Sequence, residues 1–194
     1  MTAGMSSERL QRIDQHFQEK YIDAGKLPGV LTLVARRGEI VHFSTLGKID
    51  IEQNKPTEKD TIYRIYSMTK AITSVALMML YEEGRFQLGD PVHQYLPEWK
   101  NTAVWVSGDS PNFTTRPQDR PMTIRDLLTH QSGLSYGFSD DHAVDRAYQQ
   151  VDREEMMAMH LPEWSKKASE IPLLFSPGTA WEYSVATDLC GYLV

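Results

Sequence analysis

Ser67 and Lys70 are the two residues whose types and spacing could do chemistry together. They open the run from Ala71 to Tyr81, which is rich in helix formers and apolar on nearly every side, so we expect a buried helix there. A spacing of three residues places the two side chains on one helix face, where the hydroxyl and the amine can reach each other. The pattern indicates a serine that a lysine activates as a nucleophile.

An activating lysine must lose its proton more easily than usual. The pKa of a free lysine is about 10.4, and a base that works at neutral pH needs a pKa of roughly 7 to 8. Burial of Lys70 in apolar surroundings would lower its pKa in this direction. Ser67, at the helix start, would lie near free backbone N–H groups that stabilise negative charge. The alternative is a serine cap followed by a lysine that reaches water, and for so short a pattern only the surrounding chain can decide.

Composition and charge narrow the classes of function. The chain of 194 residues suffices for one sizeable domain, and 20 basic against 26 acidic residues give a net charge of −6 without a basic block. We therefore expect no nucleic-acid partner and no membrane partner. The single cysteine, Cys190, excludes an internal disulfide and is interpreted as a small buried hydrophobe. The polar N-terminus and the lack of a long apolar run predict a cytoplasmic protein.

The first part of the chain predicts a helix and a hairpin. Residues 7–24 carry apolar side chains at helical spacing, with Ser6 or Ser7 as the cap. Residues 30–36 and 40–46 are rich in β-branched and aromatic residues and are joined through a short glycine turn, which predicts an antiparallel pair of strands. Two strands alone are marginal in water, so this sheet is expected to be incomplete.

Everything after Thr61 is typical of helices and loops. The expected division is therefore residues 1–60, with the N-terminal helix and hairpin, and residues 61–194, which are mostly helical. Residues 100–121 are rich in small and polar residues. A loop of this length inside a compact domain is usually functional, often as a wall or a lid.

Three short helices are expected in the second region. Thr123 would cap one of them, with Asp126 on its outward side, and residues 152–159 would form an amphipathic one. The last, residues 186–194, stops in mid-pattern on two apolar residues without a cap or a polar tail. Together with the two-strand sheet, this ending suggests that further strands, or a second fragment that completes the sheet, lie outside this chain.

Four segments stand in a fixed order along the chain: Ser67 to Lys70, Leu127 to Leu134, Phe175 to Gly178, and Tyr183 with Ser184. In this order and at these distances they resemble the serine β-lactamase and penicillin-binding-protein superfamily, and within it the class C-like branch that includes the family VIII carboxylesterases. The resemblance covers essentially the whole chain. It implies an α+β, β-lactamase-like fold, in which an antiparallel sheet is flanked by helices and accompanied by a helical subdomain.

The resemblance also implies roles for individual residues. Ser67 would be the nucleophile, Lys70 its partner, and Tyr183 would help to move the proton between nucleophile and leaving group. No cofactor and no metal is expected. Val185 stands where penicillin-recognising members usually have the asparagine of a Tyr-x-Asn motif, which favours an ester over a β-lactam. The family's third motif, a Lys-Thr-Gly or related triplet, occurs nowhere in these residues, and the loss of its oxyanion donor would leave the chain inactive by itself.

A rival nucleophile stands in the run from Gly133 to Gly137, which fits the G-x-S-x-G pattern with Ser135 at its centre. That mechanism needs a strand before the serine and a helix after it, whereas here a helix precedes and a polar loop follows. The pattern is therefore interpreted as a loop turn. Tyr136 and Phe138 in the same stretch are candidates for lining the acyl pocket, with ordinary loop packing as the alternative.

The histidines are weighed in the same way. By resemblance, His130 has a structural role and holds the loop behind the site. His142 and His160 have no partners at ligand spacing, so the run Asp140-Asp141-His142 is interpreted as a solvated loop rather than a metal site.

The favoured hypothesis is a serine hydrolase that cleaves esters of small acyl groups by a ping-pong route through an acyl-enzyme, with a small-molecule ester as its partner. A second hypothesis keeps the fold but takes a β-lactam or a D-amino-acid peptide. Acyl transfer to an acceptor other than water is a variant that the sequence leaves open. A third hypothesis treats the protein as a non-catalytic binding or sensor module.

Overall fold

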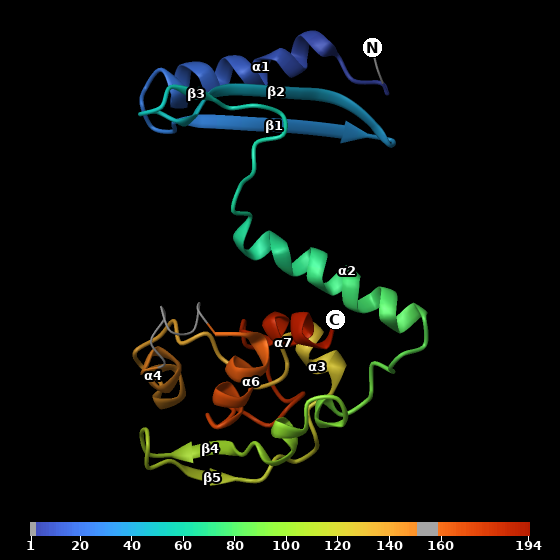
Figure 1. Ribbon diagram of the computed structural model, residues 1–194, viewed down its shortest axis with the longest axis vertical. Coiled ribbons are helices and arrows are strands. Elements are labelled where there is room, and N and C mark those ends of the chain that lie inside the picture. Colours follow the sequence, from blue (N-terminus) through green and yellow to red (C-terminus); the bar gives the residue numbers. More distant parts are fainter. Residues whose placement is uncertain (1–2, 151–158) are drawn as a thin grey trace. The chain divides into compact units, whose positions relative to one another are not determined.

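The computed structural model describes residues 3–150 and 159–194 (Figure 1). The chain divides into two compact units, residues 1–64 and 65–194. The amphipathic helix expected over residues 152–159 lies outside the described residues, except for Met159.

The N-terminal helix of the first unit is confirmed. Helix α1 spans Ser7–Phe17, and the Ser6 side chain caps it by accepting a hydrogen bond from the Arg9 backbone N–H at 3.3 Å. A π-helical turn, Gln18–Ile22, continues it. The buried side of α1 packs against β2, where Asp14 accepts a hydrogen bond from Ser44.

The predicted hairpin is also present in this unit. Strands β1, Gly29–Arg36, and β2, Glu39–Asp50, pair antiparallel. The two residues between them, Arg37 and Gly38, both have positive φ angles, as a two-residue hairpin turn of the primed type requires. A third strand, β3, Lys55–Pro56, pairs with β2. The sequence did not predict it, because two residues that include a proline carry no strand pattern.

The second unit is mainly helical and is built around one apolar core. Helix α7 contacts α2, α3 and α6, and it lies beside α3 and α6 in Figure 1. Trp99, Leu127, Leu173 and Leu189 are among the fully buried side chains of this core. The α-helices described in this unit are α2, Thr69–Glu82; α3, Ile124–Leu128; α4, Ala143–Gln150; α6, Leu161–Ser169; and α7, Ala186–Leu193. Short 3-10 turns span Tyr66–Met68, Val92–Gln94 and Pro97–Asn101.

The sequence predicted that helix α2 is buried on every side, and this prediction is wrong. Leu77 is 1% exposed, whereas Ile72, Val75 and Met79 are 62%, 61% and 59% exposed. An all-round apolar pattern shows which faces could be buried, but not which of them have a partner. Within its unit α2 packs on α7, and that contact covers one side of the helix.

The stretch predicted as a long loop contains a hairpin. Strands β4, Val104–Ser107, and β5, Thr114–Arg116, pair antiparallel. The base of β4 is bound to Leu173, whose N–H donates to the Ala103 carbonyl at 2.8 Å. The expectation that only helices and loops follow Thr61 is therefore wrong here. The sequence did not reveal β5, because its three residues are all exposed and polar and show no alternation.

Helix α3 is anchored by a carboxylate that the sequence placed outward. Thr123 caps α3 as predicted, and Asp126 completes a capping box with it. Asp126 is nevertheless buried, because both guanidinium nitrogens at the tip of Arg120 donate to its carboxylate at 2.6 and 2.8 Å. This pair fixes the start of the segment that leads to His130.

Two segments far apart in the sequence are joined by backbone hydrogen bonds. The carbonyls of His130, Gln131 and Gly133 accept from residues 182, 178 and 174, at 2.9, 2.8 and 2.7 Å. Gly133 has φ +84°, and a Cβ there would lie 2.3 Å from the Phe175 carbonyl oxygen. Only glycine fits this close approach, which brings three of the sequence motifs together.

No helix in the described ranges, 3–150 and 159–194, is long and apolar enough to cross a membrane.

Candidate active site

Ser67 lies at an exposed turn directly before α2. It is the middle residue of the 3-10 turn Tyr66–Met68, so the regular helix begins two residues later than the serine. Tyr66 has φ +45°, a conformation that bulky residues rarely adopt. Backbone strain of this kind is found mainly where function requires a particular side-chain direction.

The structure brings Ser67, Lys70 and Tyr183 together, and Tyr136 with them. The Tyr183 hydroxyl donates to Ser67 Oγ at 2.9 Å. Lys70 Nζ donates to the Tyr136 hydroxyl at 2.7 Å and lies 4.9 and 5.1 Å from the ring centroids of Tyr183 and Tyr136. Tyr183 therefore has the serine at its hydroxyl and the ammonium group near its ring.

The pKa of Lys70 is raised, in contrast to the depressed pKa that the sequence predicted. Burial lowers the pKa, but Lys70 is only partly buried, and its hydrogen bonds and charge interactions with Tyr136 and Tyr183 outweigh the burial. The pKa of Tyr183 is lowered by its hydrogen bonds with Ser67 and Lys70 and by the positive charge of the lysine. These shifts favour the ammonium form of Lys70 and ease the ionisation of Tyr183.

Tyr136 lies in an aromatic stack beside this cluster. Its ring stacks on Tyr183 at 5.4 Å and on Phe138 at 4.7 Å, with interplanar angles of 27° and 7°. Phe138, the other predicted pocket residue, is 68% exposed. The sequence placed Tyr136 in the acyl pocket and missed its contact with Lys70, because the two residues are 66 positions apart and no spacing rule connects them.

Ser135, the rival nucleophile, is buried and hydrogen-bonded. It is 1% exposed, its hydroxyl donates to Asp145, and its Oγ accepts from the Gly137 N–H at 3.0 Å. A serine in such a position cannot meet a substrate. The loop-turn interpretation of the G-x-S-x-G pattern is consistent with these contacts.

The other candidate groups have ordinary contacts. His142 accepts a hydrogen bond from the Val144 N–H and packs its ring 4.4 Å from that of Trp105. Cys190 is buried in the core, and burial raises its pKa to about 12. In the part of the chain that the structure describes, no three histidine, cysteine or acidic side chains gather in a way that could hold a metal ion.

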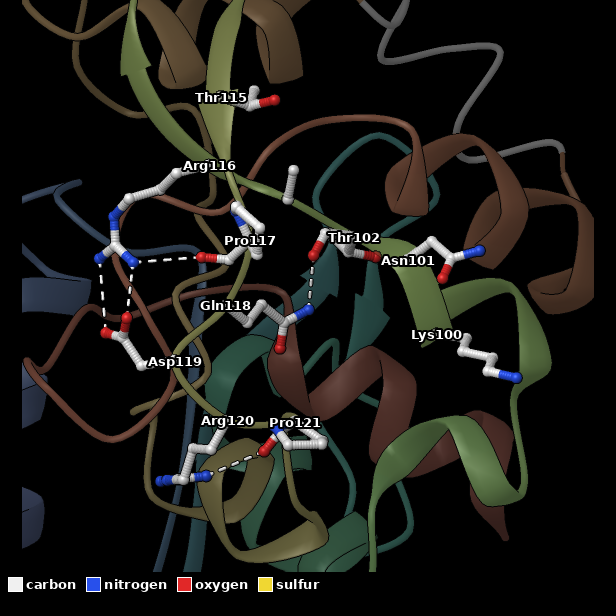
Figure 2. Close-up of a pocket in the computed structure, with 11 residues that line it drawn as sticks. Lys100, Asn101, Thr102, Thr115, Arg116, Pro117, Gln118, Asp119, Arg120 and Pro121 are labelled. Carbon is white, nitrogen blue, oxygen red and sulfur yellow. Dashed lines mark hydrogen bonds and ion pairs between the residues drawn. The ribbon is translucent and has the colours of Figure 1, made fainter.

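A cavity of about 520 Å³ lies at the base of the β4–β5 hairpin (Figure 2). It is lined by residues 100–103 and 115–121. Arg116 points to Asp119 and is paired with it at 2.8 Å, and Gln118 donates to a backbone carbonyl across the cavity. No residue of the cluster around Ser67 lines this cavity.

Residues 11–194 match the Beta-lactamase family over most of the chain. The chain belongs to the beta-lactamase family. It is 31% identical to the esterase EstB of Burkholderia gladioli over 198 residues, which cover 100% of this chain and 46% of EstB. It is 30% identical to a lovastatin esterase of Penicillium rubens over 94% of this chain and 45% of that protein.

A solved structure shows the same fold. EstCE1, described as a hydrolase with promiscuous acyltransferase activity, superposes with a TM-score of 0.78 at 28% identity, over 95% of this chain and 46% of EstCE1. The resemblance to the serine β-lactamase and penicillin-binding-protein superfamily is confirmed, and so is the β-lactamase-like α+β fold. The chain spans less than half the length of each of these three relatives.

Proposed function

We propose that the protein is a serine hydrolase that cleaves carboxylic esters through an acyl-enzyme on Ser67. The observation that carries the proposal is the hydrogen bond of Tyr183 to Ser67, with the Lys70 ammonium 4.9 Å from the centre of the Tyr183 ring. Membership of a beta-lactamase family with esterase relatives supports a hydrolytic enzyme. Because the chain spans less than half of these relatives, the activity is proposed for the whole protein.

In the acylation half-reaction, Ser67 Oγ attacks the ester carbonyl while Tyr183, as the phenolate, takes the serine proton. The distance of 2.9 Å between the two oxygens suits a direct transfer. The Lys70 ammonium stabilises the phenolate electrostatically and keeps its own protons. The tetrahedral intermediate then collapses, the bond to the alcohol oxygen breaks, and the leaving alkoxide receives the proton from Tyr183.

In the deacylation half-reaction, a water molecule takes the place of the alcohol. Tyr183 removes a proton from the water, the resulting hydroxide attacks the acyl carbonyl, and the ester bond to Ser67 breaks. Tyr183 returns the proton to Ser67 Oγ, and the carboxylic acid leaves. The same phenol serves as base and acid in both halves, which requires a pKa closer to the working pH than that of free tyrosine.

Val185 favours an ester over a β-lactam as the substrate. It occupies the position of the Tyr-x-Asn asparagine, and it is 2% exposed within the core. An apolar side chain turned into the core offers no hydrogen bond to a lactam amide side chain. A site that lacks this hydrogen-bonding group gains little binding energy from the amide side chain of a β-lactam.

Acyl transfer to an alcohol is a second candidate function. EstCE1, which has the same fold, is described as having promiscuous acyltransferase activity. The chemistry differs only in the second acceptor, since an alcohol replaces water in deacylation. The two outcomes are separated by measuring ester and acid products when an alcohol is added.

The test uses the whole chain that the gene encodes, with p-nitrophenyl acetate, butyrate and octanoate beside nitrocefin. We expect turnover of at least one ester, little hydrolysis of nitrocefin, and loss of ester turnover by about 10⁴-fold or more in Ser67→Ala. A Ser135→Ala variant serves as the matched control at a second serine and should remain active if it folds. Nitrocefin turnover above ester turnover, or an active Ser67→Ala variant, would contradict the proposal.

A further inference from the structure

His130 holds the chain on both sides of Tyr183. Its backbone carbonyl accepts a hydrogen bond from the Glu182 N–H at 2.9 Å, and its side-chain Nδ1 accepts one from the Ser184 N–H at 3.3 Å. Its ring also lies 4.9 Å from the ring of Tyr183, and Trp181 packs on its edge. One residue thus contacts all four residues from Trp181 to Ser184.

The contacts of Nδ1 require a neutral imidazole. The Ser184 hydroxyl lies 3.3 Å from the same nitrogen, so both polar groups of Ser184 near the ring can donate to it. Nδ1 can accept only when it carries no proton, which leaves the ring proton on Nε2. Ser184 is fully buried, so water cannot replace the lost acceptor if Nδ1 becomes protonated.

Burial and a nearby positive charge also favour the neutral form of the His130 ring. The titratable groups that face His130 are Lys70 of α2 and Tyr183 of the segment before α7. Burial, and then the positive charge of Lys70, lower the pKa of His130 below its ordinary value. The backbone of His130 has φ +56°, so the side chain is held toward this segment by a conformation that few residues adopt easily.

We propose that His130 is a positioning residue for Tyr183, whose neutral imidazole fixes residues 182–184 so that the phenol meets Ser67. Protonation of Nδ1 removes the acceptor of the Ser184 N–H and frees this segment, and the distance from the phenol to the serine is no longer held. The inference rests on the proposed function, because Tyr183 acts as the base there. It adds a second ionisation to the reaction, distinct from that of Tyr183.

The test compares two substitutions of His130 in the whole encoded chain. His130→Asn keeps a short acceptor near the position of Nδ1 and tolerates a positive φ, but it does not titrate. His130→Ala removes the acceptor. We expect His130→Ala to lower kcat on the order of 10²-fold with little change in KM, since a misplaced catalytic group loses rate rather than binding. We expect His130→Asn to recover most of kcat.

The pH profile supplies a readout that a purely structural role would not move. The wild-type protein should lose kcat as the pH falls below the ordinary range of histidine, and His130→Asn should lose this acid limb while keeping the limb that belongs to Tyr183. His142→Asn is the matched control, because Nδ1 of His142 also accepts a hydrogen bond from a backbone N–H, but that N–H belongs to Val144 and not to the segment around Tyr183. That variant should keep the wild-type profile.

The acid limb persisting in His130→Asn would overturn the inference, as would wild-type kcat in His130→Ala. If His130→Ala does not fold, the pH profiles of wild type and His130→Asn decide alone. Failure here is distinguishable from failure of the proposed function. An active Ser67→Ala variant contradicts the function, whereas an unaltered His130 series with an inactive Ser67→Ala variant contradicts only the role of His130.

Discussion

Lys70 has a tyrosine hydroxyl at 2.7 Å and two aromatic faces near 5 Å, and this environment favours its ammonium form. In the proposed mechanism the two tasks of supplying charge and accepting a proton are therefore divided between two residues. Lys70, whose pKa is raised, would supply the charge, and Tyr183, whose pKa is lowered, would accept the proton. The hydrogen bond from Lys70 to Tyr136 supports this division, because it favours the ammonium form.

Tyr136→Phe tests this division of roles. For Tyr183 the folded pKa is lowered, so kcat/KM should rise with pH through a pKa below that of free tyrosine. For Lys70 the folded pKa is raised, so activity that needs the ammonium form persists above the ordinary pKa of lysine and falls only at more alkaline pH. Removing the Tyr136 hydroxyl should shift the alkaline fall in kcat/KM to lower pH and reduce kcat/KM at neutral pH by about tenfold, as the loss of one charge-assisted hydrogen bond implies.

Phe138→Leu is the control for Tyr136→Phe. It disturbs the same aromatic stack but leaves the hydroxyl in place. The alkaline limb should then stay where it is in the wild type. Equal shifts in both variants would show that stacking, rather than the hydroxyl, sets the pKa of Lys70.

At the scale of single residues, the sequence predicted that Ser67, Lys70 and Tyr183 lie together, but not the contact of Lys70 with Tyr136. The spacing of Ser67 and Lys70 and the motif position of Tyr183 come from the sequence, and the structure places all three together. The direction of the pKa shift of Lys70 depends on Tyr136 as well as Tyr183, and Tyr136 lies outside the four motifs and reaches the amine only after folding. The apolar neighbours of Lys70 in the sequence predicted burial and therefore a lowered pKa, which is the opposite direction.

At the scale of elements, Asp126 anchors the helix that leads into the site. Burial would raise its pKa, but hydrogen bonds from Arg120 and Thr123 outweigh the burial and lower it. A lowered folded pKa means that the stabilisation is present above the unfolded pKa and is lost as the pH falls through the folded one. Asp126→Asn should reduce the free energy of unfolding by about 2 kcal/mol at neutral pH, since Arg120 stays partly in water.

Denaturant unfolding at several pH values checks this prediction. The difference between wild type and Asp126→Asn should shrink as the solution becomes acidic. Asp119→Asn is the control, because its pair with Arg116 is exposed and screened by solvent, so this variant should lose much less stability than Asp126→Asn. A deficit of Asp126→Asn that stays constant down to the acid transition would contradict the assignment.

Gly133 controls how closely two motif segments approach. Gly133→Ala adds a Cβ 2.3 Å from a backbone oxygen at φ +84°, and should destabilise the protein by about 3 kcal/mol. Gly84→Ala is matched to it, with φ +72° but nothing within 4 Å, and should lose about 1 kcal/mol. Urea unfolding of both variants separates the steric contact from the backbone strain. Equal losses would show that the approach of the two segments is not tight.

The elements that the sequence predicted well are those with strong local signals. Helix α1 has a serine cap and a clear periodicity, and the β1–β2 hairpin has two patterned strands around a glycine turn. The β4–β5 hairpin was missed because its second strand has no apolar face, and it is held instead by pairing and by the contact of β4 with Leu173. The outward placement of Asp126 failed because its partner, Arg120, lies before the helix and leaves no periodic signal.

At the scale of the whole molecule, the candidate site lies entirely in the second unit, residues 65–194. The order of the motifs and the distances between them were enough to predict the family. The order does not show how much of the catalytic apparatus these residues contain, and the chain spans less than half of its relatives. The proposed function of the whole protein thus depends on Ser67 as its nucleophile.

Labelling with a fluorophosphonate, followed by peptide mapping, tests that claim most directly. The reagent phosphonylates an activated serine, and its attachment needs the nucleophile and its base but not the natural substrate. We expect one label on the peptide that contains Ser67, faster labelling as Tyr183 ionises, and no label in Ser67→Ala. A label on Ser135, or labelling that persists in Ser67→Ala, would contradict the account.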